Sequence, residues 1–447
     1  MKESLKDKKS SRAYGLLIFA TFFMYIVLTG AKNLYVAEKT TLQSLGTFGS
    51  FTDLALTMEY YFYAYAVMQV LLLFIMKRLN IQWFLTVTLS ISAVITILTA
   101  FTDTIISHWV LYTINGAMQA GIWGCSMKAL GKYLPQKYLA TANRLMTSGP
   151  ACAGVVAYAT AALFGNNWRL PFILLGILVL CSVLLFSFSV SNVKRYPRPI
   201  ETHHIVHADG TEEDVTDEDK NDFIHLKNKK RRILFYAFSA LLGAMSTGLF
   251  FTLNNVLDIF LKQIGGFDNT TAKWITILAP VIMIVGPFLC VSACDKHTNF
   301  ITVGLGFFVL SLIVAVLLTL FFETSVALSV FMVLVFLLLT NGGRSITLSI
   351  ASLKMRSKID TGVYSTLVNA CASVTTGMLP RVITSIVDNP ALSVTQNWSN
   401  AFTVVTVFNG VIVAVLAFLI VWIKLLNKKD AKNESPVISD SVQTNEA

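Results

Sequence analysis

Apolar runs of about 20 residues recur along the chain, from residue 14 to residue 424. A helix of about 20 residues is long enough to cross the ~30 Å hydrocarbon core of a bilayer. The runs are continuous, whereas the strands of membrane β-barrels alternate apolar and polar residues over segments of about 10 residues. The pattern therefore predicts an all-α membrane protein.

The overall composition supports that class. Of the 447 residues, 55% are hydrophobic and 13% are charged, whereas soluble domains carry about 25% charged residues. The net charge of +10 could suggest a nucleic-acid partner, but the basic residues lie in short loops and tails between the apolar runs. In those places basic residues set the orientation of a membrane protein. We therefore expect a lipid bilayer around the chain and no nucleic acid.

The apolar runs predict about twelve spans. Their expected limits are 14–36, 54–76, 82–101, 105–130, 140–164, 168–190, 232–261, 273–294, 300–322, 325–352, 361–386 and 400–424. We place this multi-pass protein in a plasma membrane or a bacterial inner membrane.

Basic residues alternate from loop to loop. Cytoplasmic loops carry an excess of Lys and Arg, so both termini are predicted to be cytoplasmic, as an even number of spans requires. The basic side holds the N-terminal tail, the long middle loop, Lys77, Arg78, Lys132, Lys137, Lys296, Lys354, Arg356, Lys358, Lys424, Lys428 and Lys429. The opposite loops hold chiefly Lys39, Arg169, Lys262 and Lys273.

A single long loop divides the chain. Residues 191–231 are polar, with two prolines, an acidic stretch and a basic end, so this segment cannot bury a core of its own. We expect an N-terminal six-helix bundle at 1–190, a cytoplasmic linker at 191–231, a C-terminal six-helix bundle at 232–426 and a disordered cytoplasmic tail at 427–447.

Candidate metal ligands are few. Cys290 and Cys294 share a helix face, and His203, His204 and His207 lie in the polar linker. No histidine or carboxylate pattern completes the cysteine pair into a zinc-type site, and a solvated linker is the favoured interpretation of the histidines. We therefore expect neither a metal nor a cofactor.

An internal repeat relates the two halves. Asn115 and Gly116 precede Lys128 at the same spacing at which Asn341 and Gly342 precede Lys354. Repeated bundles joined by a cytoplasmic linker are typical of secondary transporters, whose binding site lies at the interface of the repeats near the middle of the membrane. The repeat therefore predicts a transporter rather than an enzyme.

Several stretches carry a family resemblance. They are AKNLYVAEK at the end of the first span, Ala64-Tyr65, Asn115-Gly116 with Gln119, Trp123 and Cys125, Val256-Leu257-Asp258, and LCVSACDK after the eighth span. With these residues the chain resembles the major facilitator superfamily and, within it, the organophosphate:phosphate antiporters. The resemblance implies a twelve-helix fold that moves solutes by alternating access.

The chain also departs from that branch. The branch grips phosphate with two arginines, where this sequence has Ala31 and Leu253, and its lysine and histidine positions hold Gln69 and Pro150. A buried dianion needs charged, bidentate partners. Exchange of phosphate esters is therefore not expected to follow from the resemblance alone.

Ionisable residues within spans are functional candidates. Lys32 and Asp258 occupy related positions in the two halves, and the resemblance implies that they pair as an outer gate, although each could instead reach the outer interface. Glu59 is a candidate carrier of a coupling proton. Asp295, with Gly286 and Lys296, keeps the superfamily's gating pattern after the eighth span.

Polar residues within the spans are candidate substrate ligands. Amides can both donate and accept hydrogen bonds, although each could equally serve helix packing. Arg344 could contact an anionic substrate, while Arg381 is interpreted as reaching the interface. The expected substrate-binding set is Lys32, Tyr65, Gln69, Asn115, Gln119, Asn254, Asn255, Arg344 and Asn369.

The expected function is secondary transport of a small polar organic solute, neutral or anionic, driven by a proton gradient or by an exchanged solute and carried out by a monomer. Two alternatives stay open. A transporter-like sensor could signal through the linker, and the Gly149-Pro150 pair in the fifth span resembles a motif of drug or lipid exporters that work by proton antiport.

Overall fold

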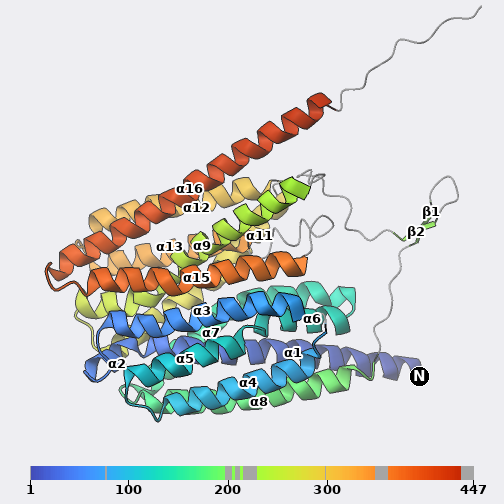
Figure 1. The fold of residues 1–447 in the computed structure, drawn as a ribbon, viewed down its shortest axis with the longest axis horizontal. Helices are drawn as coiled ribbons and strands as arrows, with labels where there is room; N and C mark the ends of the chain where they lie inside the picture. The colour runs from blue at the N-terminus through green and yellow to red at the C-terminus, as the bar shows by residue number, and fades with distance from the viewer. Residues whose placement is uncertain are drawn as a thin grey trace, which may run out of the picture.

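The computed structural model describes residues 2–75, 78–196, 204–206, 212–214, 229–296, 299–347 and 361–433. Long helices run side by side and form two groups, with the N-terminal half below the C-terminal half in the view of Figure 1. Helices α3 and α15 lie against each other where the two groups meet.

Eight helices make up the N-terminal half. They are α1 (Lys2–Ala37), α2 (Lys39–Ser44), α3 (Phe51–Ile75), α4 (Ile81–Thr99), α5 (Ile105–Gln119), α6 (Ile122–Tyr133), α7 (Gln136–Phe164) and α8 (Arg169–Val193).

The C-terminal half follows a short strand pair. Its helices are α9 (Lys229–Gln263), α10 (Asn269–Thr276), α11 (Leu278–Lys296), α12 (Phe300–Phe321), α13 (Val326–Ser345), α15 (Thr361–Val387) and α16 (Val394–Asn433). The strands β1 (His204–Val206) and β2 (Glu212–Asp214) pair antiparallel within the linker segment, which the sequence analysis did not expect.

An all-helical membrane fold is confirmed, apart from that strand pair. Ten helices within the described residues are long and apolar enough to cross a membrane. The expected span 105–130 is divided between α5 and α6, and the described apolar stretch of α7, Ser148–Phe164, is short. The count of twelve spans and the cytoplasmic position of both termini therefore stay predictions.

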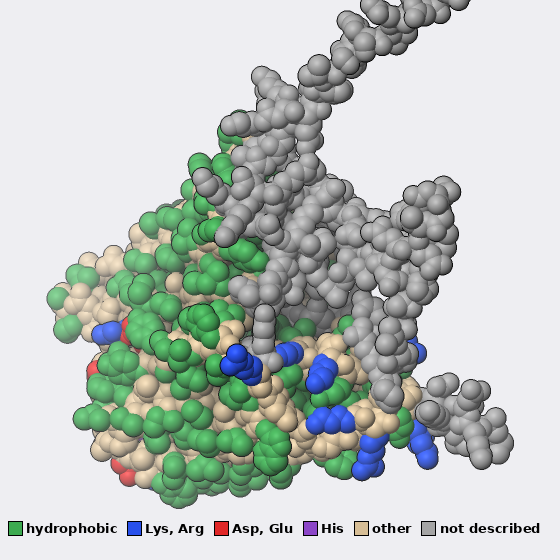
Figure 2. Space-filling model, turned by 45° about the vertical axis from the view of Figure 1, so that its right-hand side comes forward, with side chains coloured by type: hydrophobic (Ala, Val, Ile, Leu, Met, Phe, Trp, Pro, Cys, Tyr) green, Lys and Arg blue, Asp and Glu red, His purple; other side chains and the backbone are tan. Residues whose placement is uncertain are grey.

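The outer surface of the bundle is that of a membrane protein. Large apolar side chains such as Phe74 and Trp83 are 77% and 65% exposed, and hydrophobic side chains cover the flank in Figure 2. Lys and Arg gather at the end of the bundle that faces the viewer in that figure. Seven exposed basic residues lie in N-terminal segments that the sequence analysis placed on the cytoplasmic side, and Lys424 lies at the end of the last span. The seven are Lys9, Arg12, Arg78, Lys132, Lys137, Lys194 and Arg195.

Helical structure continues beyond the predicted end of the first span. A bend at Glu38 (φ −95°, ψ 0°) separates α1 from α2, and the candidate span covers Lys9–Ser44. Lys39, which the sequence analysis assigned to an outer loop, is therefore a buried helical residue with 1% exposure.

The Asn-Gly repeat marks a close helix crossing in each half. A Cβ atom on Gly116 of α5 would lie 2.1 Å from the Tyr61 carbonyl oxygen of α3. In the second half, a Cβ atom on Gly342 of α13 would lie 3.0 Å from the Gly286 carbonyl oxygen of α11. Small residues let helix backbones approach closely in a membrane. The fourth expected span of each half thus packs on the second through a glycine.

We predict that Gly116→Leu destabilises the protein, because the side chain collides with the backbone of α3. The melting temperature of the detergent-purified variant should fall by at least about 5 °C. Gly306→Leu on α12, where a Cβ atom meets nothing within 4 Å, is the matched control. Equal melting temperatures for the two variants would contradict the assigned crossing.

Candidate functional site

A buried ion pair connects the two halves at the end of the bundle opposite the basic end. The ammonium of Lys273 on α10 lies 2.6 Å from Glu38 Oε2, and both side chains are 0% exposed. Lys273 Nζ also donates to the Gly165 carbonyl oxygen at 3.1 Å. Removing either partner from such a pair leaves an uncompensated buried charge. This contact therefore holds α10 against the end of α1.

Two further charges lie beside that pair. Lys39 Nζ donates to the Asn255 carbonyl oxygen at 3.1 Å, and Asp258 interacts electrostatically with Lys39 and Lys273. Both carboxylate oxygens of Asp258 are buried without a hydrogen-bond partner among the described residues. We call Glu38, Lys39, Asp258 and Lys273 the outer charge cluster.

The structure does not bring Lys32 and Asp258 together. No salt bridge of 4.0 Å or less joins these two described side chains, and the lysines that interact electrostatically with Asp258 are Lys39, Lys273 and Lys262. Asn254 and Asn255 lie near the cluster, where their backbone carbonyl oxygens accept hydrogen bonds from Tyr158 Oη at 3.3 Å and from Lys39 Nζ. These two asparagines contribute backbone atoms to contacts between the halves.

A second ion pair joins α3 to α15. Arg381 Nη1 lies 2.8 Å from Glu59 Oε2, and Tyr63 Oη donates to the other Glu59 oxygen at 2.5 Å. Close by, the amide and hydroxyl of Thr52 both donate to Asp388 Oδ2 at 2.8 Å. The sequence analysis considered Glu59 and Arg381 separately and did not pair them.

Two cations lie at the centre of the bundle, one from each half. The ammonium of Lys32 on α1 lies 5.1 Å from the Phe62 ring centroid and 5.8 Å from that of Phe251. The guanidinium of Arg344 on α13 lies 4.5 Å from the Phe250 ring centroid and 5.8 Å from the same Phe251 centroid. Among the described residues, no carboxylate lies within 4.0 Å of either cation.

A single side chain orients the guanidinium of Arg344. Its Nε and Nη2 atoms donate to Asn341 Oδ1 at 3.1 and 2.8 Å, while Asn341 Nδ2 donates to the Met283 carbonyl oxygen at 2.7 Å. Asn341 thus connects α13 to α11 and fixes the arginine at the same time. The sequence analysis used Asn341 only as a mark of the repeat.

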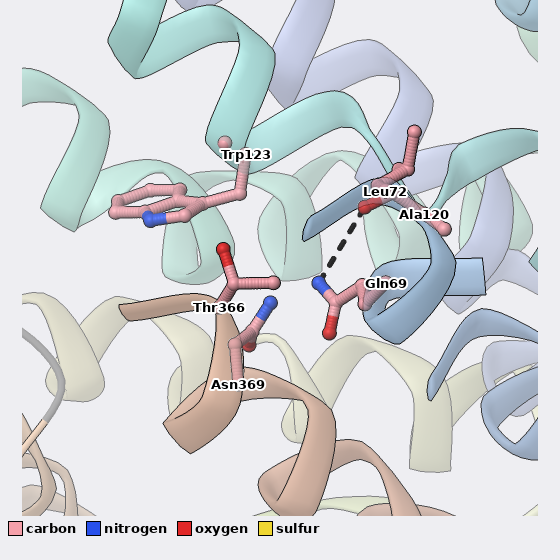
Figure 3. Close-up of a pocket in the computed structure, with 7 residues that line it drawn as sticks. Gln69, Leu72, Ala120, Trp123, Thr366 and Asn369 are labelled. Atoms are coloured by element: carbon pink, nitrogen blue, oxygen red, sulfur yellow. Dashed lines mark hydrogen bonds between the residues drawn. The ribbon is translucent and has the colours of Figure 1, made fainter. Parts of the chain in front are cut away.

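A small pocket with a mostly apolar lining and two amide side chains lies between the halves. It is lined by Gln69, Leu72, Ala120, Trp123, Gly124, Thr366 and Asn369, and it holds about 240 Å³ of empty space that includes solvent at its mouth. Figure 3 shows the amides of Gln69 and Asn369 approaching each other from α3 and α15, below Trp123. Gln69 Nε2 lies 3.5 Å from the Ala120 carbonyl oxygen, and Tyr65 interacts with both amides.

Asn115 and Gln119 lie in a buried network within the N-terminal half. Asn115 Oδ1 accepts from Ser92 Oγ at 2.6 Å and from Gln119 Nε2 at 3.0 Å, and Gln119 Oε1 accepts from Tyr61 Oη at 2.7 Å. Their exposures are 1% and 2%. These bonds connect α3, α4 and α5, so the two amides pack helices and do not face the pocket.

Tyr25 is a residue of the centre that the sequence analysis missed. Its ring lies 5.6 Å from that of Trp123 in the pocket, and it interacts electrostatically with Arg344 and Tyr65. In the sequence, a tyrosine of the site cannot be distinguished from an aromatic residue of the hydrophobic core, because both lie in an apolar run. Tyr25 connects the pocket to the central cations.

The remaining predictions from the sequence concern gating and metals. Asp295 lies in the last turn of α11, and its side chain falls outside the described residues. No group of three His, Cys, Asp or Glu side chains that could hold a metal ion occurs in the part of the chain that the structure describes. His203 and His207 lie outside that part.

Solved structures share this fold. A bacterial homologue of the human lysosomal transporter Spinster, in an inward-facing and occupied conformation, matches with a TM-score of 0.66 at 15% identity, over 91% of this chain and 96% of that one. The nucleoside transporter NupG matches with a TM-score of 0.59 at 15% identity, over 91% and 99% of the two chains. At such identities the likeness shows the fold alone.

Family membership rests on sequence. No curated protein matches the chain as a sequence relative. The family described as the Major Facilitator Superfamily matches residues 14–380, which run from α1 into α15. This family match indicates a transporter rather than an enzyme. The chain belongs to the major facilitator superfamily.

Proposed function

We propose that this protein is a secondary active transporter that moves a small polar organic solute by alternating access. The observation that carries the proposal is the small pocket between the halves, to which one half contributes the amide of Gln69 and the other the amide of Asn369. A solute bound there contacts both halves at once. Such a position, at the interface of the repeats, is where transporters of this architecture bind their substrates.

The moving bodies of this proposal are a bundle at 1–190 and a bundle at 232–426, joined by the linker 191–231 and followed by the tail 427–447. We propose twelve spans in total, with both termini in the cytoplasm, in a plasma membrane or a bacterial inner membrane. The basic end of the bundle supports that orientation, since cytoplasmic segments are rich in Lys and Arg.

The outer end of the bundle is closed in this proposal. Among the described residues, three contacts between side chains join the halves there, namely Glu38 with Lys273, Glu59 with Arg381, and Thr52 with Asp388. They add to the hydrogen bonds that Lys39, Tyr158 and Lys273 donate to backbone carbonyl oxygens of the other half. Outward opening has to separate all of these contacts. Glu38, Glu59 and Asp258 are therefore the carboxylates that we propose for coupling to protons, and exchange of one solute for another is the alternative drive.

The branch within the superfamily is part of the proposal. Lys32, Asn33 and Asp258 match the organophosphate:phosphate antiporters, but Ala31 and Leu253 stand where that branch has arginines. The centre of this protein instead pairs Lys32 with Arg344 around Phe251. Two central cations also oppose the binding of cationic drugs, so efflux of such drugs is the weaker alternative.

We predict that Lys273→Gln opens the outer end more often, because Glu38 then loses its buried partner. The reporter is Thr41→Cys, which replaces a residue with 2% exposure next to the cluster. A membrane-impermeant maleimide should label this cysteine several-fold faster in Lys273→Gln than in the parent protein.

The matched control is Arg169→Gln. Arg169 and Asp103 form an exposed pair within the N-terminal half, with side chains 44% and 64% exposed, so labelling should stay at the parent rate. The charge-reversed double variant Glu38→Lys with Lys273→Glu should restore slow labelling. An unchanged rate in Lys273→Gln would show that this pair does not hold the outer end closed.

We predict that the purified protein in proteoliposomes moves at least one solute of a panel of sugars, sugar phosphates, nucleosides, amino acids and organic acids. Uptake should exceed that of protein-free vesicles and should depend on an imposed pH gradient or on solute preloaded inside. Gln69→Leu and Asn369→Leu should each lower uptake at least about tenfold, because each leaves polar groups of the solute unpaired.

Thr403→Val on α16 is the control for these variants, since its side chain is exposed on the flank of the bundle. Uptake by this variant should equal that of the parent. If no member of the panel moves under either polarity of the gradient, the transporter proposal is rejected, and a sensor that binds without transport becomes the better hypothesis.

A further inference from the structure

The two central cations share one ring. Lys32 Nζ and Arg344 Cζ each lie 5.8 Å from the Phe251 centroid, so they are no farther apart than twice that distance. Both residues are only partly buried by the protein, and the rings of Phe62, Phe250 and Phe251 lie around their charged groups. Like charges at this separation repel each other, and they do so more strongly away from bulk water.

No carboxylate of the spans is available to balance them. Among the described residues, the acidic side chains inside candidate spans are Glu38, Asp53, Glu59 and Asp258. Asp53 lies in the first turn of α3, where its Oδ2 accepts from the amide and hydroxyl of Ser50. Glu38 is bound to Lys273, Glu59 is bound to Arg381, and Asp258 faces Lys39 and Lys273. Aromatic rings stabilise a cation through their quadrupole, but they carry no net charge that could neutralise it.

Aromatic and amide side chains extend this site toward the pocket. Tyr25 interacts with Arg344 on one side and lies 5.6 Å from the Trp123 ring on the other. Beyond Trp123 are the amides of Gln69 and Asn369. The site therefore has a cationic end and an uncharged hydrogen-bonding end, with aromatic walls between them. Each end takes one residue from each half.

We propose that the transported solute is a small organic anion whose acidic group lies between Lys32 and Arg344, while its uncharged polar end contacts Gln69 and Asn369. This inference rests on the proposed function and names its substrate class. An anion at that place supplies the missing counter-charge and binds both halves together. A carboxylate and a phosphate monoester share the chemistry required, and the test distinguishes them.

The test uses matched pairs of an anion and its neutral analogue. The probes are 4-hydroxybenzoate with 4-hydroxybenzamide, succinate with succinamide, and glucose 6-phosphate with glucose. A ligand that binds only the folded protein raises its melting temperature with concentration. We expect at least one anion to raise the melting temperature of the purified full-length protein, and its neutral partner at the same concentration to leave it unchanged.

Charge variants then assign the effect to the two cations. Lys32→Gln and Arg344→Gln should each raise the Kd of the stabilising anion at least about tenfold, whereas Lys32→Arg and Arg344→Lys, which keep the charge but change its geometry, should each raise it less than the matching glutamine variant. Neither glutamine variant should lower the melting temperature of the ligand-free protein by more than about 2 °C, because each removes a repulsion and breaks no salt bridge among the described residues. Arg169→Gln is the control for a loss of positive charge elsewhere.

Three results would overturn the inference. They are equal stabilisation by the neutral partner, an unchanged Kd in both glutamine variants, and stabilisation by none of the anions. The proposed function is tested separately. If the protein transports only neutral solutes, it is a transporter and the anion site is rejected. If it binds an anion but neither takes it up nor exchanges it in proteoliposomes, the anion site stands and the transporter proposal is rejected.

Discussion

A charge that leaves water inside a membrane bundle needs a counter-charge or several hydrogen bonds. At the outer end this requirement is met across the two halves, since Glu38 pairs with Lys273 and Glu59 pairs with Arg381. The same contacts that compensate the charges therefore hold the halves together. In the proposed mechanism, opening this end brings water to Glu38, Lys273 and Glu59 and offsets the lost pairing, while Arg381 is already 44% exposed. The charges thus suit a contact that forms and breaks repeatedly.

The sequence predicts the helices of this fold well, because a span is a local property of about 20 apolar residues. It also predicts the repeat, and Gly116 and Gly342 prove to lie at equivalent helix crossings. It does not predict the inter-half pairs. Glu38 and Lys273 are 235 positions apart, and nothing local distinguishes Lys273 from a lysine in an outer loop. The distribution of basic residues predicted that Lys39 and Lys273 lie in loops on the non-cytoplasmic side. In the structure both are buried helical residues.

The candidate site was predictable only in part. Gln69 and Asn369 lie at the pocket as expected of ligands, whereas Asn115 and Gln119 bond to Ser92 and Tyr61 within one half. All four are amides in apolar helices, so residue type cannot separate the two roles. Whether an amide lines the pocket or bonds to a neighbouring helix depends on the helix face that carries it. What that face meets is set by the packing of the helices. Tyr25 was missed for the same reason, since its neighbours Trp123 and Arg344 come from other helices.

The centre of the bundle is asymmetric, although the two halves are related by a repeat. Asn115 and Asn341 occupy equivalent positions, but Asn115 Oδ1 accepts from neutral groups, whereas Asn341 Oδ1 accepts from the guanidinium of Arg344. The cation of the N-terminal half, Lys32, comes instead from the first helix. In the proposed mechanism the two bundles rock against each other, and the solute binds at this asymmetric centre, where each of its ends contacts one residue from each half.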